Sequence, residues 1–190
     1  TDRFDRRSKA KRQDNTQTFN HIGILAMNEE GLANLNKLSE IAWTEGFYSK
    51  PRIDMEVLEE YNSGLIVLSG CMNGLVSRAI ENELPALANQ YMQEFKRIFD
   101  ERFFVEIQGH NPDYLNAGLM DLAKKHKVLP VVTSDCHYAR KEDLWFEEAM
   151  LILQTSPNKA KLIDFNKSQK MEILDRFNYL YPERKMTFIR

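Results

Sequence analysis

Short apolar runs of β type alternate along this chain with longer segments of helical periodicity, and no other feature of the sequence limits the fold as strongly. The strand-like runs span residues 22–27, 64–69, 102–108 and 128–133. Helical spacing of apolar residues is found at 32–41, 84–99 and 112–127, and returns at 142–153 and 167–177. This alternation is typical of an α/β domain in which covering helices join parallel strands. We therefore expect functional side chains on the loops at the carboxyl ends of the strands.

Polar residues and a proline mark where two of these helices begin. Asn28 stands in the N-cap position before the segment 32–41. Before the segment 112–127, Asn111 is suited to cap the helix and Pro112 to fill its first position, where the missing N–H costs nothing. These signals predict the helix starts to within a few residues.

The composition is that of an ordinary globular domain. The chain has 190 residues, 43% of them hydrophobic and 28% charged, so one domain is the default and disorder is a poor interpretation. A net charge of −2 excludes the global positive field of a protein that coats nucleic acid. No apolar run approaches the roughly 20 residues that span a bilayer. Cys71 and Cys136 are too few for a disulfide framework and indicate reduced thiols in the cytoplasm.

The first twenty residues form a basic, polar arm. Six basic and three acidic side chains give it a local net charge of +3. A charge run of this kind is usually a solvated face, and we favour that interpretation over an arm that contacts phosphate. Position 1 is Thr rather than Met, so we expect the chain to be an excerpt of a longer protein.

Two loops at strand ends carry side chains that bind transition metals. The second run leads into Ser69-Gly70-Cys71, and the fourth leads into Ser134-Asp135-Cys136-His137-Tyr138. Asp135 and His137 lie two apart, so in extended backbone their side chains point the same way and can share a metal ion. The alternative is that Asp135 caps the following turn and His137 is a hydrogen-bonded loop residue.

Cys71 and His21 enlarge this candidate set. One carboxylate, two imidazoles and one thiolate suit zinc, manganese or iron, although Cys71 can also be a small buried hydrophobe. Cys136 would face the other way, and we assign it to packing. We place His126 at a helix terminus. His110 either lines the pocket or begins the next helix, and we favour the helix.

The loop 46–54, which precedes a short helix, places two cations beside two aromatic residues. Lys50 and Arg52 are candidates to hold phosphate oxygens through charge-assisted hydrogen bonds. Equally, Phe47 and Tyr48 can pack on the core while Arg52 pairs with a carboxylate. The sequence has no Gly-x-Ser-x-Gly elbow, no phosphate-binding loop ending in Gly-Lys-Ser/Thr and no dinucleotide fingerprint.

Four of these segments, taken in order, resemble the PHP (polymerase and histidinol phosphatase) domain of C-family replicative DNA polymerases, which include bacterial and phage DNA polymerase III alpha subunits. The resemblance covers residues 20–155, and four ordered motifs are far more specific than any one of them. The motifs are His21-Ile22-Gly23-Ile24-Leu25-Ala26-Met27-Asn28-Glu29-Glu30-Gly31-Leu32, Glu45-Gly46-Phe47-Tyr48 with Lys50-Pro51-Arg52-Ile53-Asp54, Gly64-Leu65-Ile66-Val67-Leu68-Ser69-Gly70-Cys71, and Ser134-Asp135-Cys136-His137-Tyr138.

The resemblance implies a distorted (β/α)7 PHP barrel with up to three divalent metal ions at one end. In that family the residues that match His21, Cys71, Asp135 and His137 are metal ligands. The remaining family ligands lie upstream, in a His-x-His motif, a histidine near a Thr-Asp-His-Gly turn, and a glutamate before the arm. None of these is in this chain, so we expect both the barrel and the metal site to be incomplete, with the opening strands upstream.

The resemblance also implies a function and partners. We expect part of a DNA polymerase III alpha subunit, a DNA-directed DNA polymerase and nucleotidyltransferase of DNA replication, with a metal-dependent phosphoesterase or 3′–5′ proofreading exonuclease site. The alternatives are a non-catalytic PHP scaffold and, less favoured, a free-standing histidinol-phosphatase-like enzyme. The expected partners are DNA, the remaining polymerase domains, and the sliding clamp and other replisome subunits, with no membrane. The palm aspartates are absent, so we expect this chain alone to be inactive.

Three segments follow from this interpretation. Residues 1–20 are the arm, 21–155 are the PHP barrel portion, and 156–190 are an exit helix and aromatic connector towards the polymerase portion. The connector is named for Tyr179-Leu180-Tyr181-Pro182, an aromatic anchor that follows the helical segment 167–177.

Overall fold

The computed structural model of the protein describes residues 5–8, 19–143, 146 and 150. The chain divides into two compact units, Thr1–Thr133 and Ser134–Arg190. The first unit contains all the strands that the structure describes. Most of the predicted helix 142–153, the predicted helix 167–177 and the connector 156–190 lie outside the described residues. The three predicted segment boundaries therefore stay predictions.

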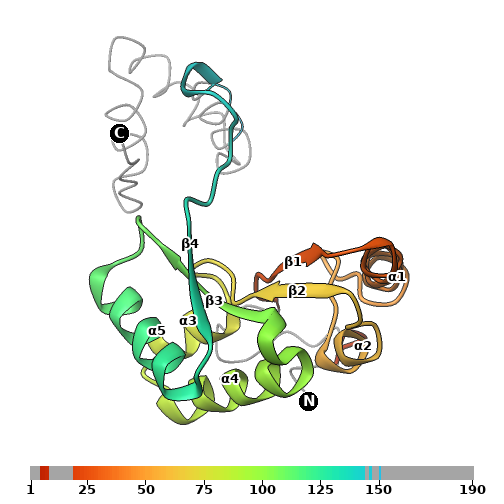
Figure 1. Ribbon diagram of the computed structural model, residues 1–190. Helices are drawn as coiled ribbons and strands as arrows, with labels where there is room; N and C mark the ends of the chain where they lie inside the picture. Colours follow the sequence, from red (N-terminus) through yellow and green to blue (C-terminus); the bar gives the residue numbers. More distant parts are fainter. Residues whose placement is uncertain (1–4, 9–18, 144–145, 147–149, 151–190) are drawn as a thin grey trace. The chain divides into compact units, whose positions relative to one another are not determined.

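The described part of the first unit is a mixed α/β structure, and all four predicted strands are confirmed within their ranges (Figure 1). The helix Leu75–Glu81 (α3) was not predicted, because its seven residues are too few to show a clear helical period. In chain order the elements are β1 (Gly23–Ala26), α1 (Glu29–Thr44), α2 (Met55–Glu60), β2 (Leu65–Leu68), α3, α4 (Pro85–Phe99), β3 (Phe103–Gln108), α5 (Asp113–His126) and β4 (Leu129–Thr133), with short 3-10 turns at Asp100–Arg102 and Lys141–Asp143.

The strands form one sheet in the order β1-β2-β3-β4. β2, β3 and β4 are parallel as expected, but β1 runs antiparallel to β2, with Gly23 opposite Leu68. The prediction of an all-parallel set is therefore wrong at β1. The reason is that two helices, α1 and α2, separate β1 from β2 and return the chain to the edge of the sheet from which it left (Figure 1). The (β/α)7 barrel itself stays a prediction.

The turn from β1 into α1 depends on a predicted cap and on a pair of glycines. The side chain of Asn28 accepts a hydrogen bond from the Gly31 N–H at 2.8 Å, which confirms Asn28 as the N-cap. A Cβ atom on Gly31 would lie 1.9 Å from the carbonyl oxygen of Gly64, and Gly64 itself has φ +67°. Only glycine at both positions lets the first turn of α1 approach the start of β2 so closely.

The second predicted helix start is displaced by one residue. Pro112 occupies the N-cap position and α5 begins at Asp113. The backbone N–H groups of Leu115 and Asn116 both donate to the Pro112 carbonyl, which fixes the helix start there. The side chain of Asn111 instead donates to Asn116 Oδ1 at 3.1 Å. Asn111 therefore belongs to the turn between β3 and α5.

Two histidines lie near the ends of α5. His126 is the last residue of α5, as predicted, and its Nε2 lies 2.9 Å from Asn89 Oδ1. Burial, with Lys125 and Lys96 nearby, lowers the pKa of His126. His110 lies in the turn after β3 rather than at the start of the helix, which is a second small correction.

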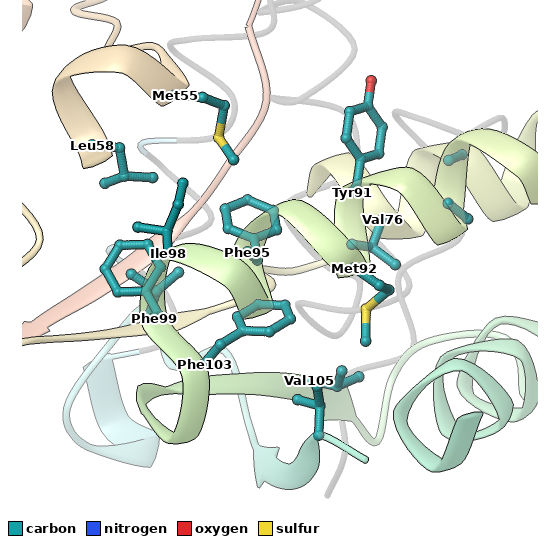
Figure 2. Packing of buried hydrophobic residues seen from close by; sticks show 14 of the residues in the cluster. Met55, Leu58, Val76, Tyr91, Met92, Phe95, Ile98, Phe99, Phe103 and Val105 are labelled. Carbon is teal, nitrogen blue, oxygen red and sulfur yellow. The ribbon is translucent and has the colours of Figure 1, made fainter. Parts of the chain in front are cut away.

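The hydrophobic core lies between the helices and one face of the sheet. Phe95 of α4 stacks on Phe103 of β3 with ring centroids 5.0 Å apart, and Figure 2 shows both rings among aliphatic neighbours from α2, α3 and α4. Val67, Val105 and Met92 are fully buried. Each such side chain contributes about 1.5–3 kcal/mol through burial. This core covers one face of the sheet, and the candidate loops start from the carboxyl edge of the same sheet.

Within the part of the chain that the structure describes, no helix has both the length and the apolar character needed to traverse a bilayer.

The described helices pack on the sheet or on one another. α3, α4 and α5 contact each other, and α4 and α5 both contact β3 (Figure 1).

Candidate metal centre

His21 and Cys71 lie together at the carboxyl edge of β2. The Sγ atom of Cys71 is 3.4 Å from Nδ1 of His21. His21 precedes β1 by two residues and Cys71 follows β2 by three. Because β1 is antiparallel to β2, the start of β1 and the end of β2 meet at the same edge. The unexpected strand direction therefore brings the two predicted residues together.

Backbone contacts hold this pair. The His21 N–H donates to the Asn73 carbonyl at 3.0 Å, and His21 forms an isolated β-bridge with Gly74. Gly70 adopts φ +83°, and a Cβ there would lie 2.7 Å from the His21 carbonyl oxygen. A side chain at position 70 would push the two segments apart, so the Ser-Gly-Cys turn needs its glycine.

Polar groups lie close to the sulfur of Cys71. The Asn73 N–H points at Cys71 Sγ at 3.4 Å, and Arg78 holds the Asn73 side chain through a 2.7 Å hydrogen bond. Cys71 is half-buried rather than sealed in the core. An N–H group directed at sulfur stabilises negative charge on it. The interpretation of Cys71 as a buried hydrophobe therefore has little support.

The donor set of this pair fits a transition metal. A thiolate and an imidazole nitrogen that share a tetrahedral zinc ion lie about 3.5 Å apart, given metal–sulfur and metal–nitrogen bonds of about 2.3 and 2.0 Å. The observed separation of 3.4 Å matches this value. The described residues contain no group of three or more His, Cys, Asp and Glu side chains arranged to hold a metal ion. Within the first unit the structure brings these two predicted residues together.

Asp135 and His137 belong to the second unit, which we describe by itself. Asp135 has φ +49°, so the extended backbone expected for this motif is wrong at that residue. Nδ1 of His137 lies 2.7 Å from the carbonyl oxygen of Asp135, which only accepts, so Nδ1 carries the proton. In a neutral imidazole the lone pair is then on Nε2, the arrangement of a histidine ready to ligate a metal.

Cys136 does not pack in a core. Its side chain is exposed, and its Sγ lies 3.1 Å from the Ser134 hydroxyl. The prediction assumed strict alternation of side chains, and the left-handed backbone of Asp135 removes that alternation.

A polar cluster that the sequence analysis did not identify lies at the same edge of the sheet, and we call it the Glu106 cluster: Ser69, Glu106, Gln108 and Thr133. The Glu106 N–H donates to the Ser69 hydroxyl at 2.9 Å. Its carboxylate accepts from Thr133 Oγ1 at 2.5 Å and from Gln108 Nε2 at 2.9 Å. Glu106 is 8% exposed and Gln108 is 1% exposed. The signal in the sequence was a pair of polar residues, two positions apart, in a strand whose other residues are all apolar.

Lys50 and Arg52 lie in the loop between α1 and α2. Arg52 donates to three backbone carbonyls, those of Gly46, Arg6 and Ser8, and its guanidinium lies 5.4 Å from the Tyr48 ring. Lys50 is exposed. These contacts give Arg52 a structural role in the loop, and phosphate binding by either residue stays a prediction.

Phe47 of the same loop does not join the core. Its ring stacks on Trp43 at 5.4 Å, and both side chains are largely exposed. The alternative in which Phe47 packs on the core is therefore wrong.

One residue of the basic arm is buried among carboxylates. Arg6 is 6% exposed and pairs with Asp54 at 3.0 Å, with Glu45 at 2.9 Å and with Glu56 at 3.3 Å. We call these four residues the Arg6 cluster. The Arg6 N–H also donates to Asp54 at 2.9 Å. Neither a solvated nor a phosphate-contacting position describes Arg6, because its guanidinium is already enclosed by acidic groups.

Comparison with known proteins identifies the family. A family model described as the PHP domain matches residues 6–110 of the 190. The DNA polymerase III subunit alpha of Aquifex aeolicus is 37% identical over 156 residues, which are 80% of this chain and 13% of that protein. The subunits of Thermus aquaticus and Deinococcus radiodurans are 40% and 34% identical over 80% and 85% of the chain, and over 12% of each relative. The chain thus spans about one eighth of the length of these relatives, and it belongs to the PHP domain family.

Proposed function

We propose that this PHP domain is part of a DNA polymerase III alpha subunit and that it carries a metal-dependent phosphoesterase site, acting as a 3′–5′ proofreading exonuclease. The observation that carries the proposal is the approach of Cys71 Sγ to His21 Nδ1, 3.4 Å, in the geometry of two donors to one ion. The similarity to polymerase alpha subunits over 80% of the chain supports the polymerase context.

In this proposal the metal is held by His21, Cys71, Asp135 and His137, and the ions are zinc, manganese or iron. Two imidazoles, one thiolate and one carboxylate are a mixed set that these metals accept. Divalent ions at such a site supply a nucleophile near neutral pH and neutralise charge on a phosphodiester during its cleavage. In this proposal the chain's own part is to present the donors, and the Gly70 turn and the His137–Asp135 backbone contact support it.

The polymerase context extends the proposal to partners. DNA with a 3′ end is the substrate, and the remaining polymerase domains, the sliding clamp and other replisome subunits are the partners. The proposal includes a (β/α)7 barrel, a site of up to three ions and a cytoplasmic location. Lys50 and Arg52 are candidates for phosphate binding in this proposal.

The test is transition-metal content by plasma mass spectrometry. It compares the protein, extended upstream, with its Asp135→Ala/His137→Ala variant, and His126→Ala serves as a histidine control. We expect the parent and the His126 variant to retain metal through purification and the double variant to lose most of it. Metal retention would then justify an exonuclease assay on 3′-ended DNA.

Absence of metal from the parent would contradict the proposal. It would favour the other candidate, a PHP scaffold that supports the polymerase without chemistry of its own. Equal metal content in the parent and the double variant would also contradict it, because the metal would then be bound by other residues.

A further inference from the structure

Each of the two loops that lead to the predicted ligands starts from a hydroxyl residue, and both hydroxyls bond to the same glutamate. Ser69 directly follows β2 and stands two residues before Cys71, while Thr133 ends β4 and stands two residues before Asp135. The Glu106 N–H donates to Ser69, and the Glu106 carboxylate accepts from Thr133. Glu106 lies on β3, between the two strands.

We infer that Glu106 is a positioning residue for the metal centre, which holds the start of the Cys71 loop through Ser69 and the start of the Asp135–His137 turn through Thr133. This inference rests on the proposed function, since it concerns the same ligands. Glu106 itself is not a ligand in it.

Burying the Glu106 carboxylate lowers the stability of the fold. The residue is 8% exposed, and among the described residues no ion pair joins it to a cation. A buried carboxylate without a cation is less stable than an apolar side chain of similar volume in the same place. Its compensation is two hydrogen bonds, from Thr133 at 2.5 Å and from Gln108 at 2.9 Å. Both donors lie at the carboxyl ends of strands.

The rest of the cluster fixes the glutamate. Gln108 is 1% exposed, and its Nε2 bonds to Glu106 and reaches Thr133 Oγ1 at 3.4 Å. The Gln108 carbonyl accepts from Asn116 Nδ2 of α5 at 2.9 Å, which ties the end of β3 to that helix. The Ser69 N–H donates to the Phe104 carbonyl at 3.0 Å. The carboxylate is thus held in one orientation, as partners of metal ligands generally are.

The arrangement also accounts for the residue types. Ser69 must accept from a backbone N–H, and Thr133 must donate to a carboxylate, so each needs a hydroxyl. Val at 133 keeps the branched shape of Thr but cannot donate, and Ser keeps the donor but loses the methyl group. The pair Thr133→Val and Thr133→Ser therefore separates the hydrogen bond from the packing.

The experiment uses the full chain and two measurements. Hydrogen exchange on the metal-free protein reports the mobility of the segments 69–73 and 134–138. Titration with Co²⁺, followed by thiolate-to-cobalt charge-transfer absorption, reports binding at the cysteine-containing site. Thermal unfolding without metal identifies any variant that is simply unfolded, and Glu106→Gln serves as a second variant, which keeps the size but not the charge.

We expect Thr133→Val to exchange faster at 134–138 and to bind Co²⁺ about 10–100-fold more weakly, as loss of a ligand's supporting partner does elsewhere. Thr133→Ser should match the parent in both measurements. Glu106→Gln should weaken binding while 69–73 stays protected, because its backbone N–H still donates to Ser69.

Two results overturn the positioning role. One is unchanged exchange in Thr133→Val, and the other is faster exchange with unchanged Co²⁺ affinity, which would make the contact structural only. A parent that binds no Co²⁺ overturns the proposed metal site, and the positioning role falls with it. The exchange data and the cobalt data therefore distinguish the failure of one from the failure of the other.

Discussion

The Arg6 cluster and the Glu106 cluster each contain a buried charged side chain. They differ in how that charge is compensated. The Arg6 cluster places one cation among three carboxylates. The Glu106 cluster surrounds one carboxylate with neutral donors, and the buried Oε1 of Gln108 accepts from nothing among the described residues. Buried charges that are paired with opposite charges favour a role in stability. Buried polar atoms without a hydrogen-bond partner are found more often at functional sites.

The largest effect is expected from removing the cation. Arg6→Ala leaves Asp54, whose side chain is 4% exposed, as a buried carboxylate without its partner. We expect a loss of about 3 kcal/mol in the free energy of unfolding, measured by urea denaturation. Arg7→Ala is the matched control, because Arg7 is 59% exposed and contacts only Glu45 of the same acids. It should change stability by no more than about 0.5 kcal/mol. Equal losses in the two variants would show that the Arg6 cluster is not buried in solution.

A smaller effect is expected in the Glu106 cluster. Ser69→Ala removes the acceptor of the buried Glu106 N–H and should cost about 1–3 kcal/mol. Ser77→Ala is the control, since its hydroxyl is buried and has no hydrogen-bond partner among the described residues. Removing that hydroxyl should leave stability unchanged or raise it. If the Ser77 variant were as unstable as the Ser69 variant, the loss would come from removing a buried hydroxyl in general and not from the Glu106 N–H.

The smallest effect concerns acid. The Arg6 side-chain hydrogen bond lowers the pKa of Glu45 below its ordinary value of 4.5. A lowered folded-state pKa adds stability above 4.5, and this stability is lost as the pH falls through the folded value. The difference in unfolding free energy between the parent and Glu45→Gln should therefore shrink below pH 4.5. In an Arg6→Ala background most of this pH dependence should be lost, and only the part due to Arg7, which also contacts Glu45, should remain. A pH dependence that is undiminished without Arg6 would assign the shift to another group.

Local patterns in the sequence predicted the strands and the main helices. Each strand is a short apolar run, and Asn28 as an N-cap was recognisable because capping depends on neighbours a few positions away. The direction of β1 was not recognisable, because it depends on how α1 and α2 return the chain over some forty residues. Sequence period alone does not record that path.

The sequence identified which residues are candidates for the site, but not the backbone arrangement that positions them. His21 and Cys71 meet, but through antiparallel pairing instead of two parallel strand ends. Asp135 was placed in extended backbone, and its positive φ is set by the turn that follows β4. Residues 102–108 were predicted as a strand, but the role of Glu106 depends on contacts with Ser69 and Thr133 from the neighbouring strands, which the local pattern does not record.

The separation of His21 from Cys71 affects how the centre is made during synthesis. The two residues are 50 positions apart. Ribosomes add about 5–20 residues per second, so the imidazole precedes the thiol by roughly 2–10 s. For most of that interval the nascent chain has neither β2 nor the turn at Gly70, which are made just before Cys71. An ion captured by the emerging peptide would be held by the imidazole alone, so metal loading of this pair belongs after β2 has left the exit tunnel.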